Sequence, residues 1–522
     1  MKLLLGIDYG TGGCKVTALG ADGSFAGEAS VEYATYHDHP GWSEQEPADW
    51  WNALAAALKK LSGKGIDLRE VAACSLDGST HNAVLLGSSG SNSLDSVLKD
   101  PSFRPVRRTI MWTDQRSTAE CEILKTGWGE KIFSRCYQMP APTWTLPQMM
   151  WLKANEPEAL EKTEHVLFVK DYVRYLLTGD AATDRIEAQG TLMWAMPGET
   201  GTPGCWDREL VALSGLGMQA MPRIIEPTDV VGRVTPEAAA FTGLPEGMPV
   251  VCGSSDSAVE DYGAGAVEPG DLIIKLATAG NVNSMTSIAH PHPKTLTYSH
   301  IVPGMWYSVS ATNAAALCMR WLRDAFYGKS DGLQGIKSAQ GGDLNVYSLI
   351  DGEASASPAG ANGVVFHPYL QGERCPYWDA NLRASFTGVS ISSTRGDFAR
   401  ALMEGVAFSL RDCYRTLEEM KLPVKRIFLI GGGARSRLWS EIVANVFNCA
   451  VAVPTPGDAS FGACLLAGTG IGVFGDVKEA VAKCLHVERT IAPDPVAAAQ
   501  YDRLFEHYRR IHDALAPVYQ AR

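Results

Sequence analysis

The chain begins with an apolar strand, a tight turn and a second strand, and this unit restricts the folds that it can adopt. Residues 3–7 (LLLGI) are apolar, residues 8–13 (DYGTGG) form the turn, and residues 15–19 (KVTAL) alternate as a strand would. The unit therefore predicts a β-hairpin whose turn presents main-chain N–H groups and hydroxyls. It is not a Walker P-loop, because in that motif the Lys lies at the start of a helix, whereas Lys15 lies at the start of a strand.

A similar unit recurs later in the chain. Residues 272–276 (LIIKL) are a predicted strand, and residues 277–281 (ATAGN) are a turn of small residues. Two halves that open in the same way indicate a duplicated fold, although the identity between them is too low to prove duplication. A turn-rich stretch at residues 243–249 separates the halves. We therefore expect two domains, at residues 1–252 and 253–522.

Length and composition bound the class of protein. The 522 residues are enough for two large domains with a cleft, and strands alternate with helical patterns in the first half, as in a mixed α/β domain. With 46% hydrophobic and 20% charged residues and no apolar run of membrane-spanning length, the chain resembles an ordinary globular protein. The apolar start ends at Asp8, too early for a signal peptide, so we expect a cytoplasmic protein. The predicted helices of the first half lie at residues 47–61, 146–154 and 172–177.

Charge and cysteine content exclude some functions. A net charge of -12 disfavours a nucleic-acid surface, although it permits a local basic pocket for phosphates. Twelve cysteines without a C-x-x-C pair favour reduced thiols over disulfides or a zinc site.

Three consecutive glycines separate a strand from a helix late in the chain. Residues 427–430 are a predicted strand, residues 431–433 are glycine, and a helical apolar pattern begins at Leu438. Without Cβ atoms the main chain allows close approach of a ligand, and the following helix N-terminus favours phosphate. A plain β–α turn is the alternative, but such a turn does not need three glycines. We therefore expect a nucleotide to bind here.

Several segments resemble the FGGY carbohydrate kinases, which belong to the sugar kinase/actin/heat-shock chaperone superfamily. The resemblance extends from about residue 5 to residue 470. It is weakest at residues 145–155, where Gln148 replaces a usual Lys and Ala154 a polar residue. The segments that carry it are residues 384–389 (ASFTGV), 397–404 (DFARALME), 372–379 (GERCPYWD), 112–116 (WTDQR) and 170–179 (KDYVRYLLTG).

One segment indicates the sugar. Residues 74–81 (CSLDGSTH) are similar to the xylulokinase segment that ends Gly-Gln-Met-His, whereas glycerol kinases have Arg-Glu there. The resemblance implies that Thr80 and His81 contact sugar hydroxyls, and it makes Trp112 and Asp114 further substrate-binding candidates. Outside the family, His81 would be a capping or core histidine. The departures at positions 79 and 80 leave the choice of sugar open.

The resemblance also implies a reaction, the transfer of a phosphoryl group. Asp256 would be the catalytic base that takes the proton of the attacking hydroxyl. On geometry alone, a role as helix N-cap fits Asp256 about equally well, and both roles can hold. Asp8 would orient Mg²⁺ and its waters against the phosphates of ATP.

ATP contacts are expected from both domains, and closure of the cleft would bring the reactants together and exclude water. A solvated side chain is the alternative for Lys15. The residues that the resemblance places around ATP are Thr11, Gly12, Gly13 and Lys15 in the first domain and Thr278, Gly280, Gly432, Gly433 and Arg437 in the second.

The function expected is therefore that of an ATP-dependent sugar kinase with a two-lobed, duplicated α/β fold of the ribonuclease H-like type. D-xylulose, converted to D-xylulose 5-phosphate, is the leading substrate, and another ketose or a polyol is the alternative. A catalytically silent sugar- or nucleotide-binding protein and a chaperone-like ATPase are competing classes. The resemblance implies a small sugar, ATP and Mg²⁺ as ligands, no nucleic acid and no membrane, and it is compatible with a homodimer.

Overall fold

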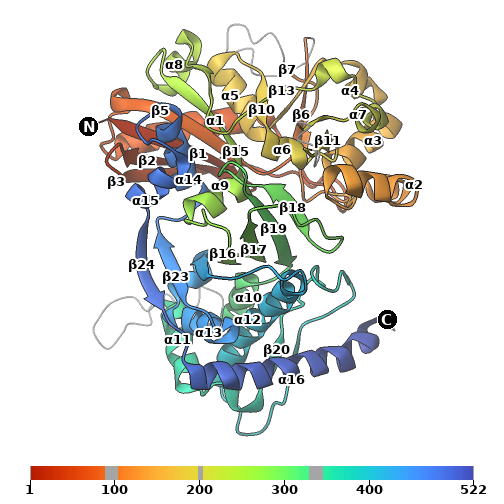
Figure 1. Cartoon of the computed structure of the whole chain (residues 1–522), viewed down its shortest axis with the longest axis vertical. Coiled ribbons are helices and arrows are strands. Elements are labelled where there is room, and N and C mark those ends of the chain that lie inside the picture. Colours follow the sequence, from red (N-terminus) through yellow and green to blue (C-terminus); the bar gives the residue numbers. More distant parts are fainter. Residues whose placement is uncertain (1, 89–103, 198–203, 329–344, 521–522) are drawn as a thin grey trace.

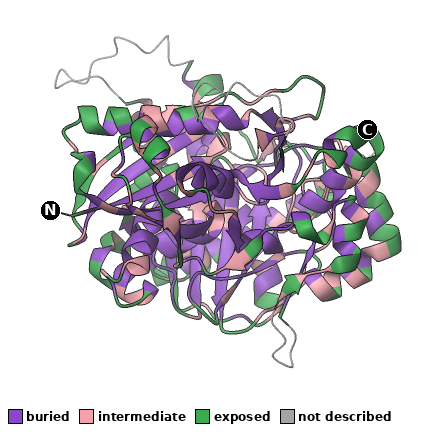
Figure 2. Cartoon of the chain, turned by 90° about the horizontal axis from the view of Figure 1, so that it is seen from above, coloured by how far each residue is buried: buried purple, intermediate pink, exposed green. Residues whose placement is uncertain are grey.

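The computed structural model has two mixed α/β halves, which lie at the top and bottom of Figure 1. The structure describes residues 2–88, 104–197, 204–328 and 345–520. Buried residues fill the sheets and the central helices, while exposed residues follow the outer helices and loops (Figure 2). In the part of the chain described, no helix is both long and apolar enough to cross a membrane.

The first sheet has six strands in the order β14-β15-β5-β1-β2-β3. β1 and β2 pair antiparallel up to Gly10 and Gly13, which confirms the predicted hairpin. β5 is parallel to β1, and β15 is parallel to β5, so the carboxyl ends of these three strands meet at one edge of the sheet. The strands are β1 (Leu3–Gly10), β2 (Gly13–Gly20), β3 (Phe25–Glu32), β5 (Val71–Gly78), β14 (Val230–Arg233) and β15 (Pro249–Ser255).

The second sheet repeats this pattern in its order β18-β19-β17-β16-β22-β23-β24. β16 and β17 form the second predicted hairpin, and β22 and β23 are parallel to β16. In both sheets, strands paired antiparallel lie on one side of the first strand, and on its other side lie two parallel strands followed by one antiparallel edge strand, β14 or β24. The strands are β16 (Asp271–Leu276), β17 (Gly280–Thr286), β18 (Leu296–Ser299), β19 (Trp306–Thr312), β22 (Arg426–Ile430), β23 (Val451–Thr455) and β24 (His486–Ile491). This repetition confirms the expected duplicated α/β fold.

The chain returns to the first sheet near its C-terminus. α14 (Ala459–Gly470) packs on β1 and β5, and a Cβ on Gly6 would lie 1.8 Å from the carbonyl oxygen of Ser460. α14 also packs on α9 (Asp256–Gly263), where a Cβ on Gly462 would lie 2.3 Å from the carbonyl oxygen of Val259. Glycine is thus needed for this close approach. The domain limits at residues 1–252 and 253–522 stay a prediction, and residues 459–470 lie on the sheet of the other half.

Other helices cover the sheets. The long helix α12 begins with a capping box, in which the side chains of Thr394 and Asp397 each bond the other's main-chain N–H. The helices, besides α9 and α14, are α1 (Pro47–Gly63), α2 (Thr118–Cys136), α3 (Thr145–Asn155), α4 (Pro157–Glu161), α5 (Val169–Thr178), α6 (Arg185–Gln189), α7 (Arg208–Ser214), α8 (Pro236–Thr242), α10 (Ala316–Phe326), α11 (Val346–Ala356), α12 (Arg395–Glu419), α13 (Arg437–Phe447), α15 (Val477–Cys484) and α16 (Pro495–Gln520).

Short strands connect these elements. They are β4 (Glu44–Gln45) with β8 (Thr109–Ile110), β6 (Ala83–Gly87) with β7 (Arg104–Pro105) and β9 (His165–Phe168), β10 (Ala182–Asp184) with β13 (Arg223–Ile225), β11 (Trp194–Ala195) with β12 (Cys205–Trp206), and β20 (Val365–His367) with β21 (Ser385–Thr387).

Candidate active site

Two carboxyl groups lie side by side at the carboxyl edge of the first sheet. Asp8 of β1 is in register with Asp77 of β5. Asp77 is fully buried, and neither of its oxygens has a hydrogen-bond donor among the described residues. Burial raises the pKa of Asp8 to about 7, and burial together with repulsion from Asp8 raises the pKa of Asp77 well above its ordinary value. The charge of Asp256 adds to both shifts.

This pair fits a hard divalent cation. Carboxylate oxygens are suitable ligands, and the unpaired oxygens of Asp77 are the kind of buried acceptors that a cation would satisfy. Among the described residues, no group of three or more His, Cys, Asp or Glu is placed to hold a metal. Mg²⁺ does not require such a group, because it takes few protein ligands and keeps water and phosphate oxygens in its shell.

Asp256 lies where β15 ends and α9 begins. Gly253 makes this position possible, because its φ is +72° and a Cβ there would lie 1.7 Å from the carbonyl oxygen of Leu76 in β5. Ser255 occupies the N-cap position, and Asp256 is the first residue of the helix. The alternative of Asp256 as the N-cap residue is therefore wrong, since the chain enters helical geometry one residue earlier than that role requires.

The hydrogen bonds of Asp256 differ between its two oxygens. Oδ1 accepts from the main-chain N–H of Ser257 at 2.6 Å and from the hydroxyls of Thr80 and Ser257, both at 3.2 Å. No donor from the described residues meets Oδ2. Burial raises the pKa of Asp256, and the charge of Lys275 partly offsets this. A carboxylate with one free oxygen and a raised pKa is suited to accept a proton.

His81 follows Thr80 in the turn after β5. The side chain is buried, its Nδ1 has no partner among the described residues, and its ring lies 4.8 Å from that of Trp144. Burial lowers the pKa of His81 to about 3, so the imidazole is neutral near pH 7. The structure thus joins Thr80 to Asp256 by a hydrogen bond and places the neutral imidazole of His81 one residue further along the chain.

Trp112 and Asp114 lie on one loop but differ in their contacts. The indole N–H of the exposed Trp112 donates to the hydroxyl of Thr11 at 3.2 Å, so this ring lies beside the first turn. Asp114 is buried, and its oxygens accept from the main-chain N–H of Ser43 and from Arg116 at 2.6–2.9 Å. Because both oxygens are occupied, its geometry favours positioning of the loop over contact with a sugar.

The first turn exposes main chain to a ligand. A Cβ on Gly12 would meet no atom within 4 Å, whereas one on Gly13 would lie 2.7 Å from the carbonyl oxygen of Val31. The ammonium of Lys15 lies 2.7 Å from Asp458 and 2.8 Å from Glu28. Its charge therefore joins the first hairpin to the N-terminus of α14.

The second turn carries Thr278 and Gly280. Thr278 is exposed, and its hydroxyl accepts from Arg320 at 3.0 Å. Gly280 is buried, and a Cβ there would lie 2.8–3.1 Å from the side chains of Leu410, Thr312 and Ala315. Glycine at this position thus serves packing.

The three glycines after β22 have different surroundings. Gly431 has φ +88°, and a Cβ there would lie 2.7 Å from the main chain of Leu276. Gly432 is exposed, and a Cβ there would meet nothing within 4 Å. Gly433 is buried, and a Cβ there would lie 2.7 Å from the side chain of Leu276 and 3.1 Å from Trp439. Of the three, Gly432 has the open space that a ligand needs.

Arg437 follows this turn. It is the first residue of α13, is exposed, and pairs with Glu441 at 2.9 Å.

Comparison with known proteins decides the family. Residues 3–263 match the N-terminal domain, and residues 279–471 the C-terminal domain, of the FGGY family of carbohydrate kinases. The chain belongs to this family. It is therefore an ATP-dependent carbohydrate kinase, which phosphorylates an alcohol group of a sugar, and the expected family, fold class and reaction are confirmed.

Individual relatives of this FGGY kinase agree in length and fold. It is 30% identical to a xylulose kinase of Lactococcus lactis over 518 residues, which are 98% of this chain and 97% of the relative. It is 26% identical to a gluconokinase of Bacillus licheniformis over 520 residues, 99% of this chain and 96% of the relative. The crystal structure of a xylulose kinase from Rhodospirillum rubrum, 27% identical, superposes with a TM-score of 0.86 and covers 99% of this chain and all of that one.

Four side chains next to the candidate residues of this FGGY kinase were not selected in the sequence analysis. Tyr298 of β18 is buried, and its ring lies 6.5 Å from that of Trp144. A strand of the second half therefore lies close to the ring that contacts His81. For one of them, Asp77, the only sequence signal was its position directly after the strand-like segment at residues 71–76. The four are Asp77, Trp144, Glu187 and Tyr298.

Glutamines of the first half hold β18 in place. Gln138 donates to the carbonyl oxygen of Thr297 at 2.6 Å and accepts from its N–H at 3.4 Å. Gln189 accepts from the N–H of Ser299 at 2.8 Å. Since β18 is the edge strand of the second sheet, these amides satisfy main-chain groups that no further strand pairs.

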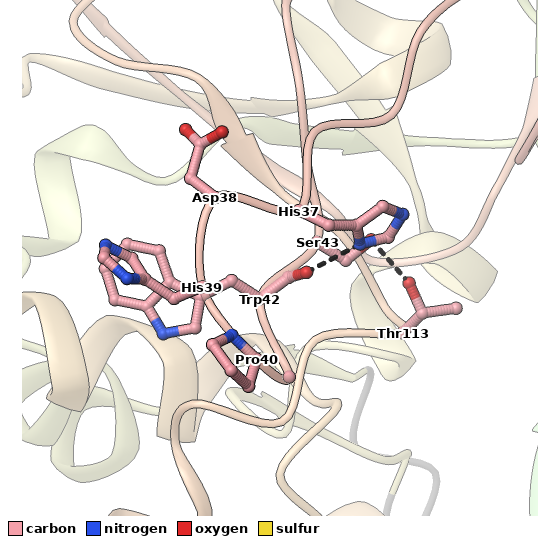
Figure 3. Close-up of a pocket in the computed structure, with 8 residues that line it drawn as sticks. His37, Asp38, His39, Pro40, Trp42, Ser43 and Thr113 are labelled. Atoms are coloured by element: carbon pink, nitrogen blue, oxygen red, sulfur yellow. Dashed lines mark hydrogen bonds between the residues drawn. The ribbon is translucent and has the colours of Figure 1, made fainter.

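A pocket of about 430 Å³ lies on the neighbouring loop (Figure 3). Two hydrogen bonds shape it, from His37 Nδ1 to the carbonyl oxygen of Trp42 and between the hydroxyls of Thr113 and Ser43, both at 2.8 Å. It adjoins the loop of Asp114 and does not include the carboxylates of the site above. Its lining consists of His37, Asp38, His39, Pro40, Gly41, Trp42, Ser43 and Thr113.

Proposed function

We propose that this carbohydrate kinase acts on a neutral ketose, D-xylulose, and forms D-xylulose 5-phosphate. The observation that carries the proposal is the carboxylate of Asp256, whose Oδ1 is held by Thr80 and Ser257 and whose Oδ2 meets no donor from the described residues. Thr80 is followed directly by the buried, neutral His81. The xylulose kinases among its relatives support the choice of sugar.

Asp256 is the general base of the proposed mechanism. Its Oδ2 takes the proton of the sugar hydroxyl while the hydroxyl oxygen forms a bond to the γ-phosphorus of ATP. The bond from that phosphorus to the bridging oxygen breaks, ADP leaves, and the proton is later released from Asp256 to water. Thr80 and Ser257 hold Oδ1 and so orient the carboxylate.

The phosphates and the nucleoside are held by the two turns and the glycine segment. Thr11, Gly12 and Gly13 offer main-chain N–H groups and a hydroxyl from the first half, and Thr278 faces the ligand from the second. Gly432 gives the nucleoside room, and Arg437 adds a cation. Packing is the role of Gly280 and Gly433, and Lys15 acts through its ion pair with Asp458. Asp114 positions the loop that carries Trp112.

Asp8, with Asp77 beside it, is the proposed magnesium site. The ion, when bound, neutralises charge on the β- and γ-phosphates. The oxygens of Asp77, which are buried and meet no donor from the described part of the chain, support this assignment.

Charge favours a neutral sugar over a sugar acid. The cations whose charge acts on Asp256 and Glu187 are Lys275 and Lys170. Lys275 pairs with Glu260 at 2.5 Å, and Lys170 pairs with Asp171 and Asp184 at 2.5 and 2.9 Å. Both lysines are thus already paired with acidic residues of the protein. A carboxylate on the substrate would face the acidic groups of the site, and neither lysine would be free to neutralise its charge.

The test is a turnover assay that couples ADP release to a signal, with D-xylulose, other ketopentoses, polyols and gluconate as acceptors. We expect the highest kcat/KM with D-xylulose and at least tenfold less with gluconate. Preference for gluconate would contradict the neutral-sugar proposal, and absence of any turnover would favour a silent binding protein. Asp256→Asn serves as the control for contaminating kinases.

A homodimer and a cytoplasmic location stay predictions. Light scattering during size-exclusion chromatography tests the first, and fractionation of cells tests the second.

A further inference from the structure

His81 has an unusual main-chain conformation. Its φ is +55°, in the left-handed region that residues with a side chain rarely adopt. Such a conformation persists where the surroundings hold it, and it is found frequently at ligand sites. The contacts of His81 therefore show which residues fix its imidazole.

Both main-chain polar groups of His81 are held by buried side chains. The carboxyl group of Glu187 accepts a short hydrogen bond from its N–H, and the hydroxyl of Thr145 donates to its carbonyl oxygen at 2.6 Å. A Cβ on Gly190 would lie 2.9–3.0 Å from Cδ2 and Cβ of the histidine, so the main chain there closes one side. Trp144 lies against the imidazole.

Glu187 is a costly residue to bury. It is 1% exposed, burial raises its pKa well above the ordinary value, and its Oε2 has no partner among the described residues. An acid that is buried and only half satisfied does not add to stability. Among the described residues, the hydrogen-bond partner of its carboxyl group is the main chain of His81, which indicates a role in shaping the site.

The helix that carries Glu187 is tied to the strand that leads to Asp256. Asp184 caps α6, accepts from the hydroxyl of Ser254 at 2.7 Å and pairs with Lys170 at 2.9 Å. Ser254 lies in β15, two residues before Asp256. The helix that carries Glu187 is thus fixed to β15, the strand that leads to the proposed base Asp256.

We propose that Glu187 is a positioning residue for the sugar: it holds the main chain of His81 so that the unpaired Nδ1 meets a substrate hydroxyl at a set distance from Asp256. The proposal rests on the proposed function. It names Glu187 as a determinant of sugar selectivity that acts through another residue.

Steady-state kinetics test the proposal with Glu187→Leu, Glu187→Gln, His81→Ala and the double variant Glu187→Leu/His81→Ala. We expect Glu187→Leu to raise the KM for D-xylulose at least tenfold and to leave the KM for ATP within twofold. Glu187→Gln keeps a carbonyl acceptor for the N–H of His81 and should restore most of the affinity. The double variant should be no worse than His81→Ala alone, because Glu187 acts through that side chain.

Glu404→Leu is the matched control. Glu404 is also a buried acid that accepts a main-chain N–H, from Gly360 at 3.1 Å, but it lies in α12 of the second half. Its loss should lower the melting temperature without a selective change in the KM for sugar. Equal effects of the two leucine variants on that KM, or additive effects in the double variant, would overturn the proposal.

A crystal structure of Glu187→Leu separates this proposal from the proposed function. We expect His81 to leave the left-handed region in the variant. If φ stays near +55°, Glu187 does not position His81, whatever sugar the wild-type enzyme phosphorylates. If His81 moves but wild-type protein phosphorylates no sugar, the positioning holds and the proposed function fails.

Discussion

The hydroxyl of Thr80 donates a hydrogen bond to Oδ1 of Asp256 at 3.2 Å and joins the end of β5 to the first turn of α9. The bond orients the carboxylate and leaves its other oxygen without a donor from the described residues. This difference determines which oxygen of Asp256 acts as the base, because only Oδ2 is available for the proton of a substrate.

Asp256→Asn tests base catalysis. The amide keeps the shape and can accept the bonds from Thr80 and Ser257, but it cannot take a proton, so kcat should fall by roughly 10²–10⁴. The melting temperature should change little. Ser257→Ala, which removes one donor to Oδ1 and leaves the carboxylate, should retain most activity. A folded Asp256→Asn enzyme with near-normal turnover would exclude Asp256 as the base.

Replacement of single glycines separates nucleotide binding from packing. Gly432→Val should weaken ATP binding with little loss of stability, because its Cβ meets no protein atom within 4 Å. Gly433→Val should instead destabilise the fold by about 1–3 kcal/mol, because it overpacks the side chains of Leu276 and Trp439. Calorimetric titration with ATP and thermal unfolding measure the two effects. The opposite result at these two positions would place the ligand at Gly433.

The stability of the ligand-free protein should depend on pH through Asp8 and Asp77. The folded pKa of both groups is raised, to about 7 for Asp8, so the folded state binds more protons than the unfolded state between about pH 4 and 7. Stability from these groups is therefore present at low pH and is lost as the pH rises through this window.

Thermal unfolding of Asp77→Asn checks this dependence. The variant should melt higher than wild type at pH 8 without metal, and the difference should shrink toward pH 5. Asp38→Asn is the control, because Asp38 is exposed. A lower melting temperature of Asp77→Asn at pH 8 would contradict the assigned repulsion.

Gln138→Ala tests how β18 is held. The change leaves the N–H and carbonyl group of the buried Thr297 without these partners, which should cost about 1–3 kcal/mol in the free energy of unfolding. Denaturant titration measures the loss, with the exposed Gln115→Ala as control. An unchanged midpoint would mean that water replaces the glutamine.

Much of the fold was predictable because its signals are local. Apolar strands before the turns at residues 8–13 and 277–281, with alternation after the first turn, predicted the two hairpins, and three glycines after an apolar strand predicted the turn before α13. These features depend on main-chain conformation and on neighbours within a few residues. The motifs at residues 372–379 and 384–404 likewise indicated the family without any coordinates.

Only the tertiary structure decided which side chains meet. Asp8 lies beside Asp77 because two strands pair in one register, and Lys15 bonds Asp458, 443 residues away, because the chain returns to the first sheet. The use of Gly433 and Gly280 in packing depends on side chains from other elements. Register, burial and partners at long range arise from the packed core, so the local pattern of residues specified the turns, and the packing fixed the contacts and charges of the site.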